Sequence, residues 1–401
     1  MRFILFILFC TIKSTLVISQ DINPQGEPIK CNAPVVLDAQ TNVFRNYALH
    51  SHSAWRNATL KAAESIEDST KKRRALRAAA QGVFVWIENP EDVYLLEELT
   101  KDIPCNEVLG VVLSGLSRID CPENNMPNVT ALPSYESLFL NPVVRIIREN
   151  PTVGFVVIVE PGVIGKVVKF ANVNTTSCDN VRQSWRQNIP ITLRSLELPN
   201  VITYMDAAHG GWLGWKEVQR EGAMEIANTW KNAGQLKQFC GLAVNVASYN
   251  AWHAIPSAPW SKADWNPARN EQRYLNILRK NIRALNVTMP LFGIVDTSRA
   301  GVQGIRRRWL DWCNVKYAGF GPLFNTNTKD SNVDALLWVK NGGFSDGSSV
   351  VNLRTDGSNC GGEDAFKPMP ARGDFSQAYF EMLLENSKPG MVRREMVRLC
   401  A

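Results

Sequence analysis

The run Val153-Gly154-Phe155-Val156-Val157-Ile158-Val159 is apolar and rich in β-branched side chains. A glycine lies within it, and Pro161 follows closely after it. A short run of this composition predicts a strand that is buried on both faces, as in a parallel sheet covered by helices. It is too short to cross a membrane, because a transmembrane helix needs ~20 apolar residues.

Similar runs occur on both sides of this stretch, with helical patterns between them. They are Val83–Ile87, Val108–Leu113, Val201–Met205, Gly241–Val246, Leu291–Val295 and Leu336–Val339. Residues 53–80 are rich in Ala, Lys, Glu and Arg and predict a helix before the first of them. This repeated alternation predicts an α/β fold with a parallel sheet that closes, or nearly closes, into a barrel. Because no Ser/Gly/Pro-rich linker divides the region, we expect one domain over residues 41–401, preceded by a leader at 20–40.

The composition excludes several classes of protein. Of the 401 residues, 45% are hydrophobic and 20% are charged, which argues against a mostly disordered, collagen-like or polytopic membrane protein. The net charge of +6 comes from 44 basic and 38 acidic residues spread along the chain. The two basic clusters, at residues 71–74 and 306–308, are typical of solvated helix faces. We therefore expect no nucleic-acid partner.

The N-terminus has the pattern of a secretory signal. Met1-Arg2 precedes the apolar run Phe3–Cys10, and Val17-Ile18-Ser19 precedes a suitable cleavage point, so residues 1–19 predict a signal peptide. No later apolar run reaches ~18 residues, and the mature protein is expected to be extracellular without a membrane anchor. Asn-x-Ser/Thr sequons agree with this route and predict surface glycosylation at Asn57, Asn128, Asn174 and Asn286.

Cysteine and histidine usage favours disulfides over a metal site. Removal of Cys10 with the signal leaves eight of the nine cysteines, an even number in an oxidising compartment. The sequence contains no CxxC pair, and its four histidines form neither HxxxH nor HExxH. We therefore expect no bound metal and no cofactor.

Carboxylates and tryptophans recur directly after the predicted strands. The segments are Ser114–Cys121, Glu160–Gly162, Asp206–Trp215, Ala247–Trp252, Asp296–Gly301 and Lys340–Gly347. In parallel barrels the chemistry lies at these carboxyl ends. Tryptophan stacks on the C–H face of a sugar, and Asp, Asn and His bind its hydroxyls. The tryptophans at or near strand ends suit a carbohydrate groove, with core packing as the alternative for each; they are Trp212, Trp215, Trp252, Trp312 and Trp338.

Several long motifs in the same order resemble glycoside hydrolase family 6, the secreted cellobiohydrolases and endoglucanases that cleave β-1,4-glucan. The motifs are residues 198–215 (LPNVITYMDAAHGGWLGW), 241–250 (GLAVNVASYN), 311–315 (DWCNV) and 338–347 (WVKNGGFSDG). The likeness runs from about Val83 to Pro389, most of the mature chain. It implies a distorted, incomplete parallel β/α barrel whose loops enclose a tunnel or cleft.

The resemblance also assigns residues. It implies a monomer that binds β-1,4-glucan, with barrel-end packing as the alternative role, through Asp206, His209, Trp212, Trp215, Asn245, Trp312 and Lys340. It implies two disulfides, Cys121–Cys178 and Cys313–Cys360. The pairing of Cys31, Cys105, Cys240 and Cys400 stays open, because these cysteines fall outside the family pattern.

The catalytic pattern of the family is broken in this chain. The family is inverting, and its proton donor is the aspartate of a Glu-Pro-Asp motif. Here the motif is Glu160-Pro161-Gly162, and glycine has no side chain to donate a proton. Loss of a general acid typically costs ~10²–10⁴-fold in rate.

At the other catalytic positions, some residues match the family pattern and others differ from it. Asp120 matches the aspartate that raises the acid's pKa, and Asp346 matches the debated base. In contrast, Ser114 replaces the tyrosine that helps to distort the sugar, and Phe344 stands where the family usually has glutamate. The loop at residues 122–127 also lacks the family's Ala/Ser/Gly-rich sequence.

Three hypotheses follow. The first is a secreted glucan-binding protein whose hydrolytic activity is lost or strongly impaired. The second is an active inverting β-1,4-glucanase that uses Glu160, Glu123 or another carboxylate as its acid, with exo or endo action undecided. The third is a non-catalytic structural or signalling protein of the extracellular matrix.

Overall fold

The computed structural model describes residues 29–116, 121, 135–253, 266–309, 311–350 and 358–387. The predicted signal peptide and Cys400 lie outside these ranges. The strands are β1 (Ala48–Leu49), β2 (Phe84–Ile87), β3 (Glu107–Leu113), β4 (Gly154–Val159), β5 (Val201–Asp206), β6 (Phe239–Val244), β7 (Phe292–Asp296) and β8 (Val333–Leu337). The α-helices are α1 (Ser53–Glu64), α2 (Ser69–Ala79), α3 (Val93–Leu99), α4 (Asn141–Glu149), α5 (Val163–Lys169), α6 (Thr176–Ser195), α7 (Gly210–Leu213), α8 (Gln219–Ala233), α9 (Glu271–Arg283) and α10 (Gln377–Glu385).

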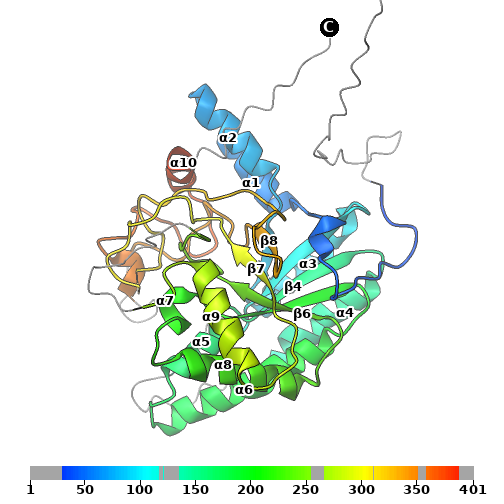
Figure 1. Ribbon diagram of the computed structural model, residues 1–401. Helices are drawn as coiled ribbons and strands as arrows, with labels where there is room; N and C mark the ends of the chain where they lie inside the picture. The colour runs from blue at the N-terminus through cyan, green and yellow to red at the C-terminus, as the bar shows by residue number, and fades with distance from the viewer. Residues whose placement is uncertain are drawn as a thin grey trace, which may run out of the picture.

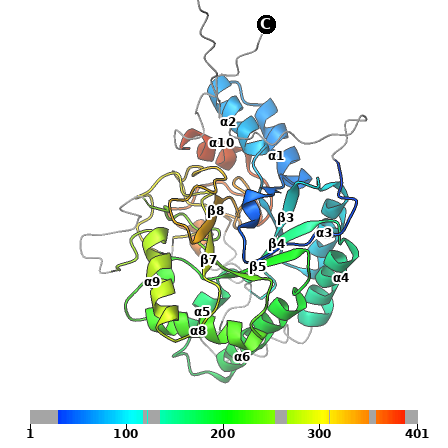
Figure 2. The same cartoon turned by 45° about the vertical axis from the view of Figure 1, so that its right-hand side comes forward.

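All eight strands belong to one parallel sheet, in the order β1-β3-β4-β5-β6-β7-β8, with β2 also paired to β3. The two edges of the sheet meet at a single parallel bridge between Val83 and Trp338. We call this junction between β2 and β8 the seam. The indole Nε1 of Trp86 also spans it and donates to the carbonyl of Val339 at 3.0 Å. The sheet therefore curls into an incompletely closed barrel, ringed by helices in Figure 2, and the predicted fold class is confirmed.

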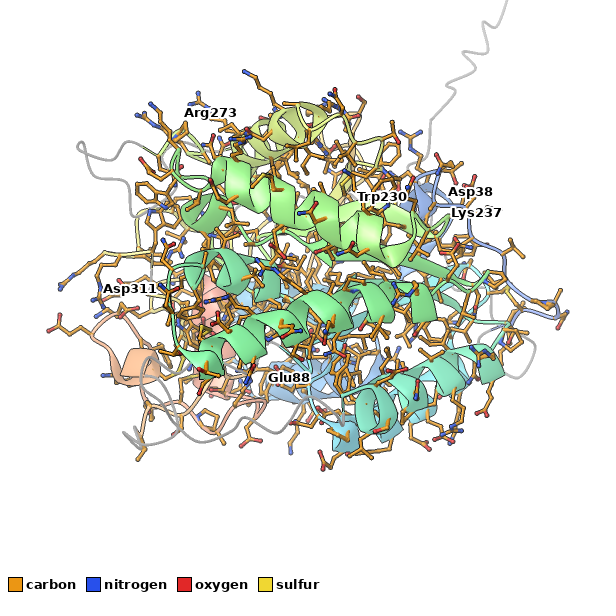
Figure 3. The ribbon with its side chains drawn as sticks, turned by 90° about the horizontal axis from the view of Figure 1, so that it is seen from below. Asp38, Glu88, Trp230, Lys237, Arg273 and Asp311 are labelled. Atoms are coloured by element: carbon orange, nitrogen blue, oxygen red, sulfur yellow. A yellow bond between two sulfur atoms is a disulfide. The ribbon has the colours of Figure 1, made fainter. Side chains whose placement is uncertain are left out.

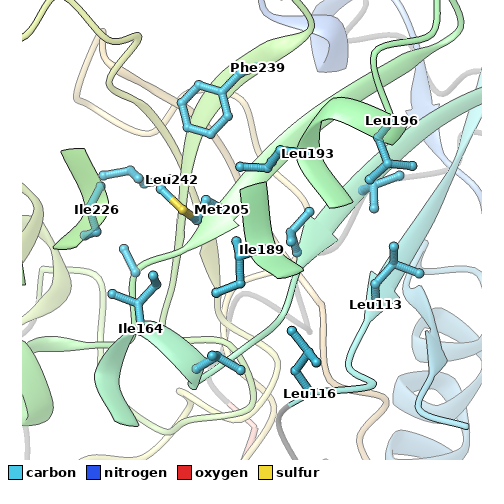
Figure 4. Packing of buried hydrophobic residues seen from close by; sticks show 14 of the residues in the cluster. Leu113, Leu116, Ile164, Ile189, Leu193, Leu196, Met205, Ile226, Phe239 and Leu242 are labelled. Carbon is cyan, nitrogen blue, oxygen red and sulfur yellow. The ribbon is translucent and has the colours of Figure 1, made fainter. Parts of the chain in front are cut away.

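Alternation along the strands explains why they are apolar at nearly every position. In β4, Phe155, Val157 and Val159 pack in the outer core beneath the helices, whereas Val156 and Ile158 pack in the barrel interior. Successive side chains of a strand point to opposite faces, and here both faces are buried. Figure 4 shows the outer core, where side chains of α5, α6 and α8 lie over β5 and β6.

The seam between β2 and β8 is covered by α1, α2 and α10, which lie together at one side of the barrel (Figure 1). Their shared core contains aromatic side chains, among them Trp55, Trp338 and Phe380. Residues 53–80 form two helices here and not the single helix that their composition predicts. The break lies at residues 65–68, where the Asp68 side chain accepts from the backbone N of Lys71 at 2.6 Å and so caps a new helix.

The segment before the barrel packs against the amino-terminal ends of the strands. Val35 and Leu37 are buried, and their backbone N–H groups donate to Pro151 and Pro199, each at 2.8 Å. A disulfide joins Cys31 to Cys105 and ties this segment to the chain before β3. Burial and a covalent link thus give ordered contacts to residues that the sequence predicts only as a leader.

The two disulfides that the resemblance implies, Cys121–Cys178 and Cys313–Cys360, are formed. Among the described cysteines, Cys240 alone has a free thiol, and it is buried. The even cysteine count does not translate into complete pairing because β6 carries Cys240 into the barrel interior. Within the described ranges, no helix has the length and apolarity that a membrane crossing requires.

Candidate active site

The backbone is strained where the strands end. Glu160, Ala208 and Asn245 follow β4, β5 and β6 and have φ angles of 49°, 55° and 62°. Non-glycine residues rarely adopt this left-handed region, and such strain clusters at functional sites. The carboxyl edge of the sheet is therefore where the residues with unusual geometry gather.

Glu160 is fully buried and holds the end of β3. Its Oε1 accepts from the backbone N of Gly115 at 3.0 Å and from the Tyr135 hydroxyl at 2.8 Å. Its Oε2 accepts from the backbone N of Leu116 at 2.9 Å. Three donors hold this carboxylate in place, so it stabilises the β3 loop and is not free to replace a missing acid.

Gly162 caps the N-terminus of α5 with a φ of 80°. Its N–H donates to Oδ2 of Asp206 at 2.8 Å. A Cβ atom built on Gly162 would meet only the Trp212 ring, at 3.6 Å. Space for a side chain therefore exists at this position, but any L-residue placed there would have a strained left-handed backbone conformation.

Asp206 ends β5 and is 1% exposed. Its Oδ2 also accepts from the backbone N of Ala208 at 2.9 Å, and among the described side chains no lysine or arginine forms an ion pair with it. Burial raises the pKa of Asp206 to about 7, against the lowering effect of its two backbone donors. This carboxyl group therefore holds its proton at weakly acidic pH.

Asp346 lies in the opposite electrostatic environment. Its Oδ2 is 2.5 Å from Nη1 of Arg299 and its Oδ1 is 3.1 Å from Nζ of Lys340. The backbone N of Asn314 donates to Oδ2 at 2.9 Å. Burial by itself would raise the pKa of Asp346, but the two cations outweigh it and hold that pKa well below its usual range. A carboxylate held in this way is a poor proton acceptor.

His209 and Trp212 lie together after β5. The Nδ1 of His209 accepts from the backbone N of Gly211 at 3.1 Å and caps α7. Burial, aided by Arg306, lowers the pKa of His209 to about 3. The imidazole is neutral, and because Nδ1 accepts, the proton lies on Nε2. The half-buried Trp212 indole lies 6.0 Å from the His209 ring and packs against Gly165 of α5.

The tryptophans at strand ends have different environments. Trp312 is 42% exposed, and Trp215 is half-buried with its Nε1 donating to the carbonyl of Gly211 at 2.9 Å. Trp252 and Trp338 are buried, and their Nε1 atoms donate to the backbone carbonyls of Thr328 and Pro322. For these last two, burial and hydrogen bonding favour core packing, the alternative left open from the sequence, over a place in a groove.

Asn245 is also fully buried. Its Nδ2 donates to the carbonyls of Asn250 at 2.9 Å and Asp296 at 2.8 Å, and its Oδ1 accepts from the backbone N of Asn250 at 3.2 Å. With these groups in use, Asn245 holds the loop after β6. Its geometry supports positioning of that loop over the direct sugar contact that the resemblance implies.

Three buried charged residues lie near the site that the sequence did not assign to it. One of them, Arg306, belongs to the 306–308 cluster predicted as a solvated helix face; that prediction is wrong for Arg306, which is buried and outside any helix. Arg299 pairs with Asp346 and lies 4.3 Å from the centre of the Tyr249 ring. Arg306 donates to Oδ1 of Asn250, and Glu271 accepts from Nδ2 of the same amide at 2.7 Å. Burial raises the pKa of Glu271 to about 7. Arg299 lies three residues after a strand, so its position could have marked it as a site residue. Glu271 has no such signal, because it resembles an ordinary acidic residue in the first turn of a helix.

Some predicted positions lie outside the described residues, namely Asp120, Glu123 and Asn128. The sequon asparagines Asn57, Asn174 and Asn286 are exposed. Phe344 packs against Trp55 and Phe375, so the residue that replaces the family's glutamate belongs to the aromatic core over the seam. Across the described part of the chain, no group of three or more His, Cys, Asp or Glu side chains is arranged to hold a metal ion.

Comparisons with known proteins agree with this architecture. The sequence model of glycosyl hydrolases family 6 matches residues 44–387. The 1,4-beta-D-glucan cellobiohydrolase CEL6C of Podospora anserina is 39% identical over 378 residues, which cover 92% of this chain and 94% of that protein. Exoglucanase 3 of Agaricus bisporus is 33% identical over 341 residues, covering 82% of this chain and 75% of that protein.

Solved structures give the same result. Cellobiohydrolase II (Cel6A) from Humicola insolens, in complex with glucose and cellotetraose, aligns with a TM-score of 0.77 and 29% identity over 87% of this chain and 99% of that chain. CcCel6C, a glycoside hydrolase family 6 enzyme from Coprinopsis cinerea, aligns with a TM-score of 0.79 and 27% identity over 88% of this chain and 99% of that chain.

Proposed function

Because the chain belongs to glycosyl hydrolases family 6, we propose that it is a secreted protein that binds β-1,4-glucan and hydrolyses it poorly or not at all. The relatives above are named cellobiohydrolases and exoglucanases, and the Humicola insolens structure holds cellotetraose. These names support the class of ligand. The impairment rests on this chain's own residues.

One observation carries the proposal, namely the arrangement after β4. Gly162 stands at the acid position, and the neighbouring carboxylate of Glu160 is held by Gly115, Leu116 and Tyr135. An inverting glycosidase needs a carboxylic acid that protonates the departing oxygen. Without it, we expect a loss of ~10²–10⁴-fold in rate on natural glucan.

The binding groups support retention of the ligand. Trp312 presents an exposed aromatic face, and the half-buried Trp212 and neutral His209 lie side by side after β5. Such faces stack on sugar rings, and the Nε2–H of His209 is a donor for a hydroxyl group. The cation Lys340 adds a further donor near Asp346.

The test compares two substrates of the purified protein. Phosphoric-acid-swollen cellulose needs a protonated leaving group, whereas 2,4-dinitrophenyl β-cellobioside releases a phenolate that needs none. We expect binding to the cellulose with little release of reducing sugar, and measurable release of dinitrophenolate. Rapid, sustained hydrolysis of the cellulose would refute the impairment, and an Asp120→Ala variant controls for contaminating cellulase.

Calorimetry with cellotetraose separates this proposal from a purely structural role in the extracellular matrix. Binding heat that Trp212→Ala abolishes supports a glucan groove. The absence of heat from the unaltered protein favours the structural role.

A second candidate, an active glucanase with a relocated acid, is favoured by Asp206. Its carboxyl group lies 2.8 Å from the backbone N of Gly162, and its pKa of about 7 keeps it protonated in weak acid. If Asp206 donates the proton, cellulose hydrolysis falls as pH rises through about 7, and Asp206→Asn removes it. Hydrolysis that survives Asp206→Asn with the same pH profile excludes this candidate.

A further inference from the structure

A cavity lies at the opposite end of the barrel from the candidate active site. Its volume is about 520 Å³, within the ~300–1,000 Å³ of ligand clefts. Its lining includes Phe292 and Val333, the first residues of β7 and β8, together with Asn42 and Arg45 beside the N-terminal segment. All of these residues belong to the described part of the chain.

The two ends of the barrel are well separated. A parallel strand rises ~3.3 Å per residue, so the five residues of β7 alone keep them more than ~10 Å apart. Figure 3 shows the separation from below, with Asp38 and Lys237 on the amino-terminal side and Asp311 at the other extreme of the molecule. A ligand in this cavity would therefore not touch Gly162, Asp206 or Asp346.

Asp334 gives the cavity a buried polar floor. Asp334 is 3% exposed, and its Oδ2 accepts from the Tyr204 hydroxyl at 2.8 Å and from the Cys240 thiol at 3.5 Å. No donor among the described residues reaches its other oxygen, Oδ1, although Asp334 lines the cavity. As a carboxylate oxygen, Oδ1 can accept a hydrogen bond from a ligand hydroxyl.

The rest of the lining identifies the chemistry of the ligand. Arg45 and Lys329 oppose a cation, whereas Asp330 and Asp334 oppose a phosphate or other anion. The remaining polar lining consists mainly of amide and hydroxyl side chains, which bind a neutral hydroxylated molecule equally well as donors or acceptors. Phe292 adds one aromatic ring of the kind that packs on the face of a sugar.

We propose that this cavity is a second carbohydrate site, which binds a sugar of one or two rings through Asp334 and the surrounding amides. It does not depend on the proposed function, because none of its residues belongs to the carboxyl edge. A hydrogen bond joins the two segments that line the cavity. The Nδ2 of Asn42 donates to the carbonyl of Asp334 at 2.7 Å, so the N-terminal segment and β8 form the site together.

Calorimetry of the full chain with cellobiose tests the proposal. We use Ser331→Trp, which fills the cavity from an exposed position, Tyr94→Ala as a control at an exposed aromatic residue, and Trp312→Ala, which weakens binding at the carboxyl edge. The expected result is a binding event that Ser331→Trp weakens at least tenfold and Tyr94→Ala leaves unchanged. Binding that Trp312→Ala removes and Ser331→Trp leaves intact, or no binding at all, overturns the second site.

Asp334→Asn is the finer variant, because it keeps the shape of the side chain and the acceptor for Tyr204. We expect a weaker affinity for cellobiose at this site and an unchanged affinity at the carboxyl edge. Thermal unfolding of each variant shows whether the fold is kept. If Ser331→Trp unfolds the protein, Asn327→Ala at an exposed lining position replaces it and must lower the affinity at least threefold. Failure of the proposed function would give a different result. Cellotetraose would then show no binding that depends on Trp212, while the cavity would still bind cellobiose.

Discussion

Asp206 and Asp346 are both buried aspartates at the carboxyl edge of one sheet, yet their pKa values are shifted in opposite directions. Asp206, beside β4, is surrounded by backbone N–H donors, and burial raises its pKa to about 7. Asp346, in the loop after β8, lies between Arg299 and Lys340, which hold its pKa well below the usual range. The difference shows that the partners, and not the residue type or the burial, decide which end of the site can carry a proton.

The same comparison clarifies where chemistry is missing. On the β4 side, Gly162 stands at the proposed acid position, and among the described residues the carboxyl group bonded to its N–H is that of Asp206, whose pKa is raised. On the β8 side the candidate base is held in two ion pairs and one backbone hydrogen bond. We expect neither side to supply efficient acid–base catalysis, while the aromatic and polar binding groups between them are kept.

The largest effect is expected from breaking the charged side. Asp346→Ala leaves Arg299 and Lys340 buried without their anion, and the loss of one partner of such a pair costs ~3–5 kcal/mol in the free energy of unfolding. Urea denaturation measures this. The matched control is Glu363→Ala, which breaks an ion pair with Arg307 whose side chains are 84% and 81% exposed and should cost less than ~1 kcal/mol. If both variants lowered the free energy of unfolding by the same amount, the buried ion pairs of Asp346 would be no more important than an exposed pair.

The next effect concerns the uncharged side and its pH dependence. The folded pKa of Asp206 is raised, so its contribution to stability is complete below about pH 4 and is lost as pH rises toward 7. Asp206→Asn has no such loss. At ~1.36 kcal/mol per pH unit, the free energy of unfolding of the wild type should fall by up to about 4 kcal/mol relative to that of the variant across this range. Thermal unfolding from pH 4 to pH 8 measures it, and parallel pH profiles would show that Asp206 is ionised in the fold.

A smaller effect is expected for the binding groups that both sides share. Trp312→Ala removes an exposed ring, so we expect about tenfold weaker binding of cellotetraose, or ~1.4 kcal/mol, with no change in melting temperature. Tyr94→Ala is the control, because Tyr94 is an aromatic residue of α3 with 63% exposure that is not among the proposed binding groups. Equal affinities for the two variants would exclude Trp312 from the groove.

The smallest effect is expected from restoring the missing acid. Gly162→Asp introduces a carboxyl group beside the Trp212 ring, but in a backbone with a φ of 80°, which costs an L-residue ~1–2 kcal/mol. Because Ser114 does not distort the sugar as tyrosine would, we expect less than a tenfold gain in cellulose hydrolysis. Gly162→Asn imposes the same backbone cost without an acid and is the control. A hundredfold gain for the aspartate alone would show that Gly162 is the sole catalytic defect.

Strand positions were predictable because they depend on local pattern. Each predicted run contains or overlaps an observed strand, since burial on both faces demands apolar side chains at successive positions. The two-residue strand β1 was missed because two residues carry no period. The predicted helix over residues 53–80 is two helices because the cap at Asp68 outweighs the helical composition around it.

Site residues were only partly predictable. A tryptophan after a strand has the same sequence signal whether it faces solvent, as Trp312 does, or packs in the core, as Trp338 does. Asn245 matches a family motif, yet its amide is used within its own loop. Exposure and hydrogen-bond partners come from contacts between distant segments, which no local window of sequence contains.

The amino-acid sequence by itself determined the parallel barrel, the family likeness and the absence of an acid side chain at Gly162, because these depend on residue identity and period along the chain. Only the tertiary structure decided that Glu160 is held by the β3 loop, that Asp206 and Asp346 have opposite pKa shifts, and that Asp334 lines a cavity at the amino-terminal end of the barrel. Charge state and accessibility depend on which groups from other strands surround a side chain, and folding alone brings those groups together.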